Sequence, residues 1–301
     1  MAADRTFCTD FALAQGEPLA GTGAMAERHL FIRWPKGKWR RPRYQSAGMD
    51  EVLQQAIHQS YGPGRYVGLL ESDGQPDLEL VSFPDGRTAL PSSQEEAAEL
   101  IRLWAGGTPL TGPALPRPVI LCCTDAKVNA CCALYGFPIY KALREKAGAF
   151  GFDVMQCTHF GGCHFAPSLI VMPQRSRYGR LTPNDIPAFL ASLAAGEFYL
   201  PAFKGRPELS EIEQCVEITA AQWAEANGLT QADVRLLDPA VETDGRATAE
   251  AEAGSTRLRI ALEQRSFHVH GTCRSVVEDE GKAVLRWVVT AVVPEAMLAP
   301  A

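Results

Sequence analysis

The feature that most constrains this chain is a dense group of cysteines and histidines in its middle. Six of the nine cysteines and two of the six histidines lie between Cys122 and His164. Thiols that only fill a core are usually scattered along a sequence, because free cysteine behaves as a small buried hydrophobe. Thiolate and imidazole are also the side chains that bind transition metals. This density therefore predicts a metal site.

The spacing of these residues divides the group into two arms. In the first arm, Cys123 ends an apolar run that is typical of a buried strand, and Cys132 follows nine positions later, just before a helical pattern over residues 133–146. In the second arm, His159 and Cys163 lie four positions apart across a pair of glycines. Because glycine lacks a side chain and accepts positive φ, backbone amides in this loop could approach bridging sulfides closely.

At these residues the chain resembles the sucrase/ferredoxin-like family, whose core is a thioredoxin-like [2Fe-2S] ferredoxin domain. The motifs that carry the resemblance are Cys123-Thr124, Cys131-Cys132-Ala133, residues 136–143, Thr158 to Ala166 and Pro173 to Arg180. The ligands that it implies for one [2Fe-2S] cluster are Cys123, Cys132, His159 and Cys163. Family members usually carry histidine at the last of these positions. The simpler thioredoxin-like ferredoxins use cysteine at both members of this pair, so a thiolate there is chemically sound.

One imidazole in place of a thiolate would change the chemistry of such a cluster. The cluster becomes less negative by one charge, so it accepts an electron more easily, and imidazole ligation raises the potential of Rieske centres above that of plant-type clusters. We expect a potential between those two classes. If His159 exchanges its second ring proton near neutral pH, the potential should depend on pH, and a flat potential between about pH 6 and 9 would contradict this coupling.

Other thiols and one histidine compete with these ligands. Cys122 and Cys131 are interpreted as core residues, because free cysteine is among the most buried residue types. The choice of the 123/132 register over 122/131 depends mainly on the resemblance. Cys157, two positions before His159, is the best spare ligand. His164 is expected either to donate a hydrogen bond to a sulfide or to lie at the surface.

Zinc and dithiol chemistry are the alternatives to an iron–sulfur cluster. Three cysteines and a histidine suit a closed tetrahedral zinc site, although structural zinc usually pairs its ligands as C-x2-4-C on both arms. No C-x-x-C occurs, which disfavours a thioredoxin-type redox motif. Nine is an odd number, and a chain of 301 residues does not need disulfides to be stable. The thiols suit a reducing compartment.

The segments around this centre predict an α/β fold. Residues 78–107 and 168–197 share a weak internal similarity, in which a strand, a proline turn, a helix and a run of small residues follow one another. We infer two thioredoxin-like (βαββα) lobes, of which the second carries the cluster and the first has lost its ligands. The domains expected are an N-terminal lobe at 1–110, the ferredoxin domain at 117–200 and an α+β extension at 201–301.

The C-terminal extension is predicted to contain a helix at 208–227 and an antiparallel pair of strands at 258–269 and 283–293. Residues 245–256, GRATAEAEAGST, are interpreted as a small, polar linker or loop, and residues 196–207 as irregular.

The remaining cysteines and two histidines are first interpreted as structural. Cys8 and Cys215 are expected to be buried packing residues. His268 and His270 are expected on a polar strand face, since residues two apart in a strand share a face. The alternative is that these histidines and Cys273 approach the cluster.

Composition limits the partners. With a net charge of −6 and a pI near 5.6, nucleic acid is not expected to be the main partner. Residues 1–20 lack a continuous apolar segment and no run is long enough to span a membrane, so we expect a cytoplasmic protein. The basic run at residues 35–44 is expected to be a solvated loop or, alternatively, a docking surface for an acidic redox partner, which Arg40, Arg41 and Arg43 would form.

Three functional classes follow from these observations. The favoured one is a one-electron carrier that serves redox partner proteins, whose identities the sequence does not reveal. An enzyme is the second class, but glycoside hydrolysis needs two carboxylates that flank the bond, and no acidic pair stands in a context that suggests them. The third class is a redox or metal sensor, an assembly factor or a structural zinc protein, in which the metal reports or stabilises and transfers no electron.

Overall fold

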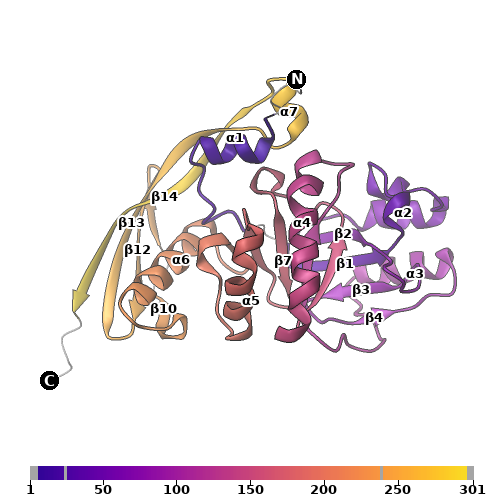
Figure 1. Ribbon diagram of the computed structural model, residues 1–301, viewed down its shortest axis with the longest axis horizontal. Helices are drawn as coiled ribbons and strands as arrows, with labels where there is room; N and C mark the ends of the chain where they lie inside the picture. The colour runs from indigo at the N-terminus through magenta and orange to yellow at the C-terminus, as the bar shows by residue number, and fades with distance from the viewer. Residues whose placement is uncertain (1–5, 24–25, 238–239, 297–301) are drawn as a thin grey trace.

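The computed structural model describes residues 6–23, 26–237 and 240–296, and these residues form two sheets with helices packed against them (Figure 1). The larger sheet is mixed and nine-stranded, and the smaller sheet is antiparallel and C-terminal. In outline, the α/β prediction with a separate C-terminal strand region is therefore confirmed. Among the helices within the described ranges, none combines the length and apolar character that a membrane crossing requires.

The first half of the large sheet comes from residues 28–105. Its elements are β1 (Arg28–Arg33), α2 (Glu51–Ser60), β2 (Arg65–Leu70), β3 (Leu80–Phe83), β4 (Thr88–Ala89) and α3 (Gln94–Ala105). Asp50 and Ser93 fix the starts of the two helices, because each side chain accepts a hydrogen bond from the backbone N–H three residues later. Strand β1 pairs in parallel with β2 and antiparallel with β3, which pairs antiparallel with β4.

The second half repeats this arrangement. Its elements are β5 (Val119–Cys123), α4 (Ala130–Lys146), β6 (Asp153–Cys157), β7 (Ser168–Met172), β8 (Ser176–Gly179) and α5 (Ile186–Ala194). Strand β5 pairs in parallel with β6 and antiparallel with β7, which pairs antiparallel with β8. Strands β5 and β7 are buried along their whole length, as their continuous apolar runs predict. Short 3₁₀ helices flank these elements at Ala147–Phe150 (η3) and Pro183–Asp185 (η5).

The two halves meet where β2 pairs antiparallel with β6 at Leu70 and Cys157, the last residue of each strand. The order across the sheet is therefore β4-β3-β1-β2-β6-β5-β7-β8-β9. In each half the two parallel strands point the same way, and β2 meets β6 antiparallel at the last residue of each. The carboxyl ends of β1 and β2 therefore face those of β5 and β6. The loops that follow these strands consequently lie close together at the middle of the sheet.

The C-terminal part adds one strand to the large sheet and forms the small one. Its elements are η6 (Leu200–Ala202), β9 (Phe203–Gly205), α6 (Glu211–Ala226), η7 (Gln231–Asp233), β10 (Val234–Leu236), β11 (Val241–Thr243), β12 (Arg246–Ala253), β13 (Thr256–Val269), α7 (Cys273–Val277) and β14 (Lys282–Ala296). The predicted pair corresponds to β13 and β14. The interpretation of residues 196–207 as irregular misses β9, which pairs with β8.

The prediction of a linker or loop at residues 245–256 is wrong, because most of this segment forms strand β12. Its residues alternate between exposed and buried positions, and the buried ones are Ala247, Ala249, Ala251 and Ala253. These methyl groups pack with α6, which lies across the strand. The period of two is that of a half-buried strand. Alanine at the inward positions permits this packing, and its small size is also why the segment resembled a loop.

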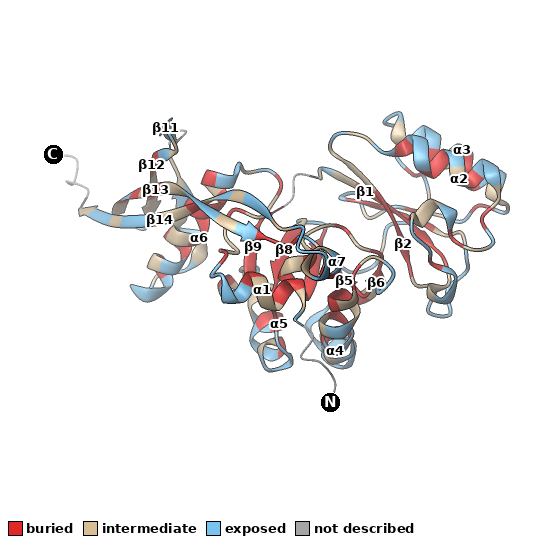
Figure 2. Ribbon diagram, turned by 90° about the horizontal axis from the view of Figure 1, so that it is seen from above, coloured by how far each residue is buried: buried red, intermediate tan, exposed pale blue. Residues whose placement is uncertain are grey.

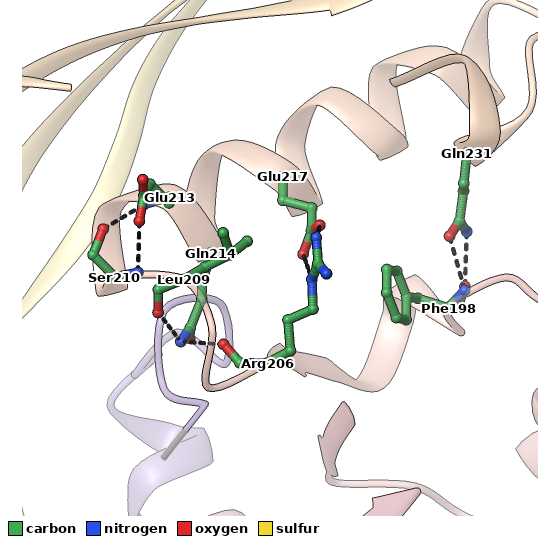
Figure 3. A network of polar contacts seen from close by, with 8 residues as sticks. All are labelled: Phe198, Arg206, Leu209, Ser210, Glu213, Gln214, Glu217 and Gln231. Atoms are coloured by element: carbon green, nitrogen blue, oxygen red, sulfur yellow. Dashed lines mark hydrogen bonds and ion pairs between the residues drawn. The ribbon is translucent and has the colours of Figure 1, made fainter. Parts of the chain in front are cut away.

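Polar contacts at the start of α6 anchor the helix (Figure 3). Ser210 and Glu213 form a capping box in which each side chain bonds the other residue's backbone N–H. Arg206, which precedes α6, forms an ion pair with Glu217 within the helix. The buried amide of Gln214 donates to the carbonyl of Arg206 (3.0 Å). These contacts stabilise the join between the last strand of the large sheet and the C-terminal part.

Two short helices from opposite ends of the sequence lie beside the second half of the sheet. Helix α1 (Cys8–Ala14) and helix α7 lie next to each other near the start of α4 (Figure 1). Figure 2 shows buried residues concentrated in the strands of the large sheet, whereas much of the C-terminal sheet is exposed. The N-terminal and C-terminal segments therefore converge on the region that contains the cysteine-rich loops.

Candidate metal centre

The first arm of the centre lies where β5 ends and α4 begins. Cys123 is the last residue of β5, and Cys132 lies in the first turn of α4, so the helix starts earlier than its sequence pattern predicts. Both side chains are buried. Strand and helix approach closely at Gly136, where a Cβ would lie 2.2 Å from the carbonyl oxygen of Cys123. This approach, which only glycine permits, holds the two thiols on neighbouring elements.

The second arm is the loop after β6. His159 and Cys163 lie on either side of Gly161 and Gly162, whose φ angles are +103° and +71°. Residues with a side chain rarely adopt such angles, so the glycines allow the chain to reverse between the two donors. The loop continues into η4 (Cys163–Phe165). Cys163 is buried, whereas His159 is partly exposed.

The structure brings the four predicted ligands together. The Sγ atoms of Cys132 and Cys163 are 3.3 Å apart, and the Sγ of Cys163 lies 3.0 Å from Nδ1 of His159. The ligand atoms of Cys123, Cys132 and His159 all lie within 4.8 Å of one another. Three thiols and one imidazole thus converge from two arms, and this donor set suits iron and zinc. Their role as ligands stays a prediction.

Hydrogen bonds within the set give it thiolate character. Cys132, followed by His159, donates hydrogen bonds that lower the pKa of Cys123 to about 7 and that of Cys163 to about 6, although burial opposes both shifts. The pKa of Cys132 is raised in turn, chiefly because its thiol donates to Cys123. Burial disfavours the charged form of His159, but hydrogen bonds with Cys123 and Cys163 raise its pKa to about 10. A metal cation could therefore replace the protons that these four side chains share.

Two buried cations lie against the glycine loop. Lys204 of β9 faces the ring of Phe165 at 4.6 Å, and a Cβ at Gly162 would lie 2.7 Å from its Nζ. Arg177 of β8 is buried over the ring of Phe160, and its Nε has no hydrogen-bond partner in the described part of the chain. Burial lowers the pKa of Lys204 to about 7 and that of Arg177 to about 10. An anionic metal–thiolate group in the adjoining loop would offset this buried positive charge, so the surroundings fit an iron–sulfur cluster.

The basic run at residues 35–44 turns partly inward, toward this centre. It forms the short 3₁₀ helices η1 (Lys36–Lys38) and η2 (Arg43–Gln45). Lys36 donates to the hydroxyl of Thr124 (2.8 Å), the residue after Cys123, and Arg43 donates to the carbonyl of His159 (2.7 Å). Two cations of the run thus support the ligand-bearing loops. Arg40 and Arg41, by contrast, are exposed.

The competing candidates lie outside the four-donor set. Cys122 packs on the other side of the sheet, where its thiol donates to the carbonyl of Gly136 (3.4 Å). Cys157 neighbours Cys123 in the register of β5 and β6. The surface alternative for His164 is wrong, because its side chain is mostly buried and its Nε2 lies 3.4 Å from Oε1 of Glu17. A hydrogen bond from His164 to a sulfide stays a prediction.

The structure contains a second group of thiols that the sequence patterns do not predict. Cys8 and Cys131, both expected to be simple core residues, have Sγ atoms 3.4 Å apart, and the Sγ of Cys273 lies 3.7 Å from that of Cys8. No local spacing could reveal this group, because its members lie 123 and 265 positions apart. His268 and His270 instead form a separate group with Asp279. Cys215 packs in the core, as predicted.

Comparisons with known proteins place this geometry in context. The family model described as sucrase/ferredoxin-like matches residues 19–205, more than half of the chain. A thioredoxin-like [2Fe-2S] ferredoxin from Aquifex aeolicus is 16% identical over 31% of this chain and 94% of its own, with a TM-score of 0.28. Its wild-type form in another structure is 14% identical, over 31% of this chain and 100% of its own, with a TM-score of 0.27. No curated protein matches the chain.

Proposed function

This chain belongs to the sucrase/ferredoxin-like family, and we propose that it binds one [2Fe-2S] cluster and acts in one-electron transfer. The proposed ligands are Cys123, Cys132, His159 and Cys163. The observation that carries the proposal is the convergence of these four donors, three buried thiols and one partly exposed imidazole, from the β5–α4 turn and the loop after β6. The buried cations beside the set support it, because they suit an anionic group.

The cluster, when bound, supplies a one-electron couple, and the chain's residues determine its environment. Lys204 and Arg177 place positive charge beside the glycine loop, which favours the reduced and more negative form. Arg43, which donates a hydrogen bond to the carbonyl of His159, also favours the reduced form. Burial of the three thiols excludes water, whereas the partly exposed His159 gives the centre one edge that a partner or a proton can reach.

The finer description of the fold belongs to the same proposal. Each half of the large sheet has a parallel pair followed by two antiparallel strands and a helix, and this repetition supports two thioredoxin-like lobes. We assign the lobes to residues 1–110 and 117–200, with the extension at 201–301. The first lobe contributes cations to the centre and no ligand in this arrangement.

Redox partner proteins are the proposed partners, in a reducing compartment such as the cytoplasm that suits nine free thiols. The exposed Arg40 and Arg41 are the best positioned residues of the basic run for docking an acidic partner. Charge reversal at these two positions should slow reduction by the partner without loss of iron. Arg43 is left out of this variant, because its contact with His159 would confound the result.

The first experiment is to record the optical and EPR spectra of anaerobically purified protein before and after dithionite, and to quantify iron, sulfide and zinc. We expect visible absorption that bleaches, a reduced S = 1/2 signal and about two irons per chain at this site. Serine at Cys123, Cys132 or Cys163, and alanine at His159, should each lower the iron content. The matched control is Cys122→Ser, a buried cysteine next to the site. A colourless protein that holds zinc at these four residues would refute electron transfer.

A further inference from the structure

Three cysteines from distant parts of the chain meet beside the proposed cluster site. Cys8 begins α1, Cys131 lies in the first turn of α4, and Cys273 begins α7. Their ligand atoms all lie within 4.8 Å of one another, and all three side chains are buried. We propose that these three thiols form a second metal site that binds one thiophilic ion of closed electron shell, Zn²⁺ or Cu⁺.

The distances suit a single ion. The Sγ of Cys8 lies 3.4 Å from that of Cys131 and 3.7 Å from that of Cys273. Thiolates that share a tetrahedral Zn²⁺ with bonds of about 2.3 Å are about 3.8 Å apart. Soft thiolates also select Cu⁺. A small adjustment of the sulfurs would therefore be enough to hold either ion, and binding would release the thiol protons to the solvent.

Asn129 provides an independent sign that the group is built around its sulfurs. Asn129 occupies the N-cap position of α4, where an asparagine side chain normally accepts a hydrogen bond from the first turn, but it makes no such bond. Its buried amide instead donates to the Sγ of Cys8 (3.2 Å) and accepts from the backbone N–H of Cys273 (2.8 Å). One side chain thus orients two of the three thiols, as the outer residues of metal sites do.

The segments that bring these thiols are held in place by contacts of their own. In α1, the hydroxyl of Thr9 donates to the carbonyl of Ala166 (2.9 Å), and Asp10 accepts from the hydroxyl of Tyr135 in α4 (2.7 Å). The hydroxyl of Thr272 caps α7. An ion shared by the three cysteines would clamp α1 and α7 against the start of α4, next to the loops of the first site (Figure 1).

An ion can reach this site from outside. A shallow pocket of about 350 Å³ is lined by Cys273, Asn129, Val128 and Glu278 among others. Three thiols leave the fourth position of Zn²⁺ open, and the pocket offers it to water. Cu⁺ would be complete with three. The number of ligands around the ion therefore distinguishes the two metals.

The second site is separate from the proposed function, because it shares no ligand with the first. The test measures zinc, copper and iron in anaerobically purified protein, alone and after addition of Zn²⁺ or Cu⁺, for wild type, the triple variant Cys8→Ser/Cys131→Ser/Cys273→Ser and Cys123→Ser. Cys215→Ser, at a buried cysteine elsewhere, is the matched control. We expect the triple variant to lose one equivalent of zinc or copper and to keep its iron. Cys123→Ser should lose iron and keep the other metal.

A measurement on wild type covers the case in which the variants do not fold. X-ray absorption at the edge of the bound metal should show three sulfur neighbours. Zinc and copper contents that the triple variant leaves unchanged would overturn the proposal. It would also be overturned if wild type takes up neither metal, or if Cys8 forms a disulfide with Cys131 or Cys273 in the anaerobic protein.

Discussion

The buried Lys204 makes the stability of the metal-free chain depend on pH. Lys204 lies in the middle of β9, between the glycine loop and the core of the second half. Burial, followed by the charge of Arg177, lowers its pKa from the ordinary 10.5 to about 7. Replacement by methionine keeps much of the side-chain volume and removes the charge. Lys204→Met should therefore abolish one specific pH dependence of the free energy of unfolding.

The sign and size of the effect follow from proton binding. Between about pH 7 and 10.5 the unfolded chain holds a proton on Lys204 that the folded chain has released, so unfolding takes up a proton and stability rises with pH. The slope approaches about 1.4 kcal/mol per pH unit, which amounts to about 2 kcal/mol between pH 7 and 9. Below pH 7 the full cost of the buried charge, roughly 5 kcal/mol as an upper limit, acts against the wild-type fold.

The assay is urea unfolding of metal-free wild type and Lys204→Met at several values between pH 6.5 and 9.5. As the pH rises, the unfolding free energy of wild type should increase relative to that of Lys204→Met. Lys141→Met, at an exposed lysine of α4, controls for the loss of an ammonium group at the surface. Parallel pH curves for wild type and Lys204→Met would refute the reasoning, because they would mean that Lys204 keeps its proton in the folded chain.

Three further predictions concern the centre itself. His159→Cys should lower the potential of the bound cluster by roughly 100–300 mV, because a thiolate adds negative charge; voltammetry that finds no change would argue against imidazole ligation. Arg43→Met should leave the carbonyl of His159 without its cationic donor, lowering the potential and costing about 1–3 kcal/mol of stability in urea unfolding; an unchanged midpoint and potential would show that this contact is dispensable. Gly136→Ala should displace α4 from Cys123, reducing both iron content and stability, whereas Gly148→Ala, whose Cβ would meet nothing within 4 Å, should do neither; equal behaviour of these two variants would contradict the close-packing argument.

The sequence predicts much of the large sheet because its signals are local. Apolar runs mark β5 and β7. The two arms of the centre were also local, since each is defined by a spacing of nine positions or fewer. The motif resemblance then selected Cys123 and Cys132 over their neighbours.

Other features depend on contacts between distant segments, and the sequence could not reveal them. Cys8 looks like an isolated core residue, and nothing local in the sequence joins it to Cys131 and Cys273. The pairing of His164 with Glu17 likewise joins residues far apart in the sequence. The sequence does not predict strand β12 for a different reason: its inward residues are alanines, and the hydrophobic signal of a strand weakens as its side chains become smaller.

The junction of the two halves brings cations of the first half beside the proposed centre. Strands β2 and β6 pair only at their last residues, Leu70 and Cys157, so the loops after β1, β5 and β6 meet there. The loop after β1 contains Lys36 and Arg43, and this position alone brings their charges to Thr124 and to the carbonyl of His159. Had the halves joined at another edge, the same basic run would lie far from the cluster loops. The first half therefore places cations beside the proposed centre, and these cations should affect the potential of a bound cluster.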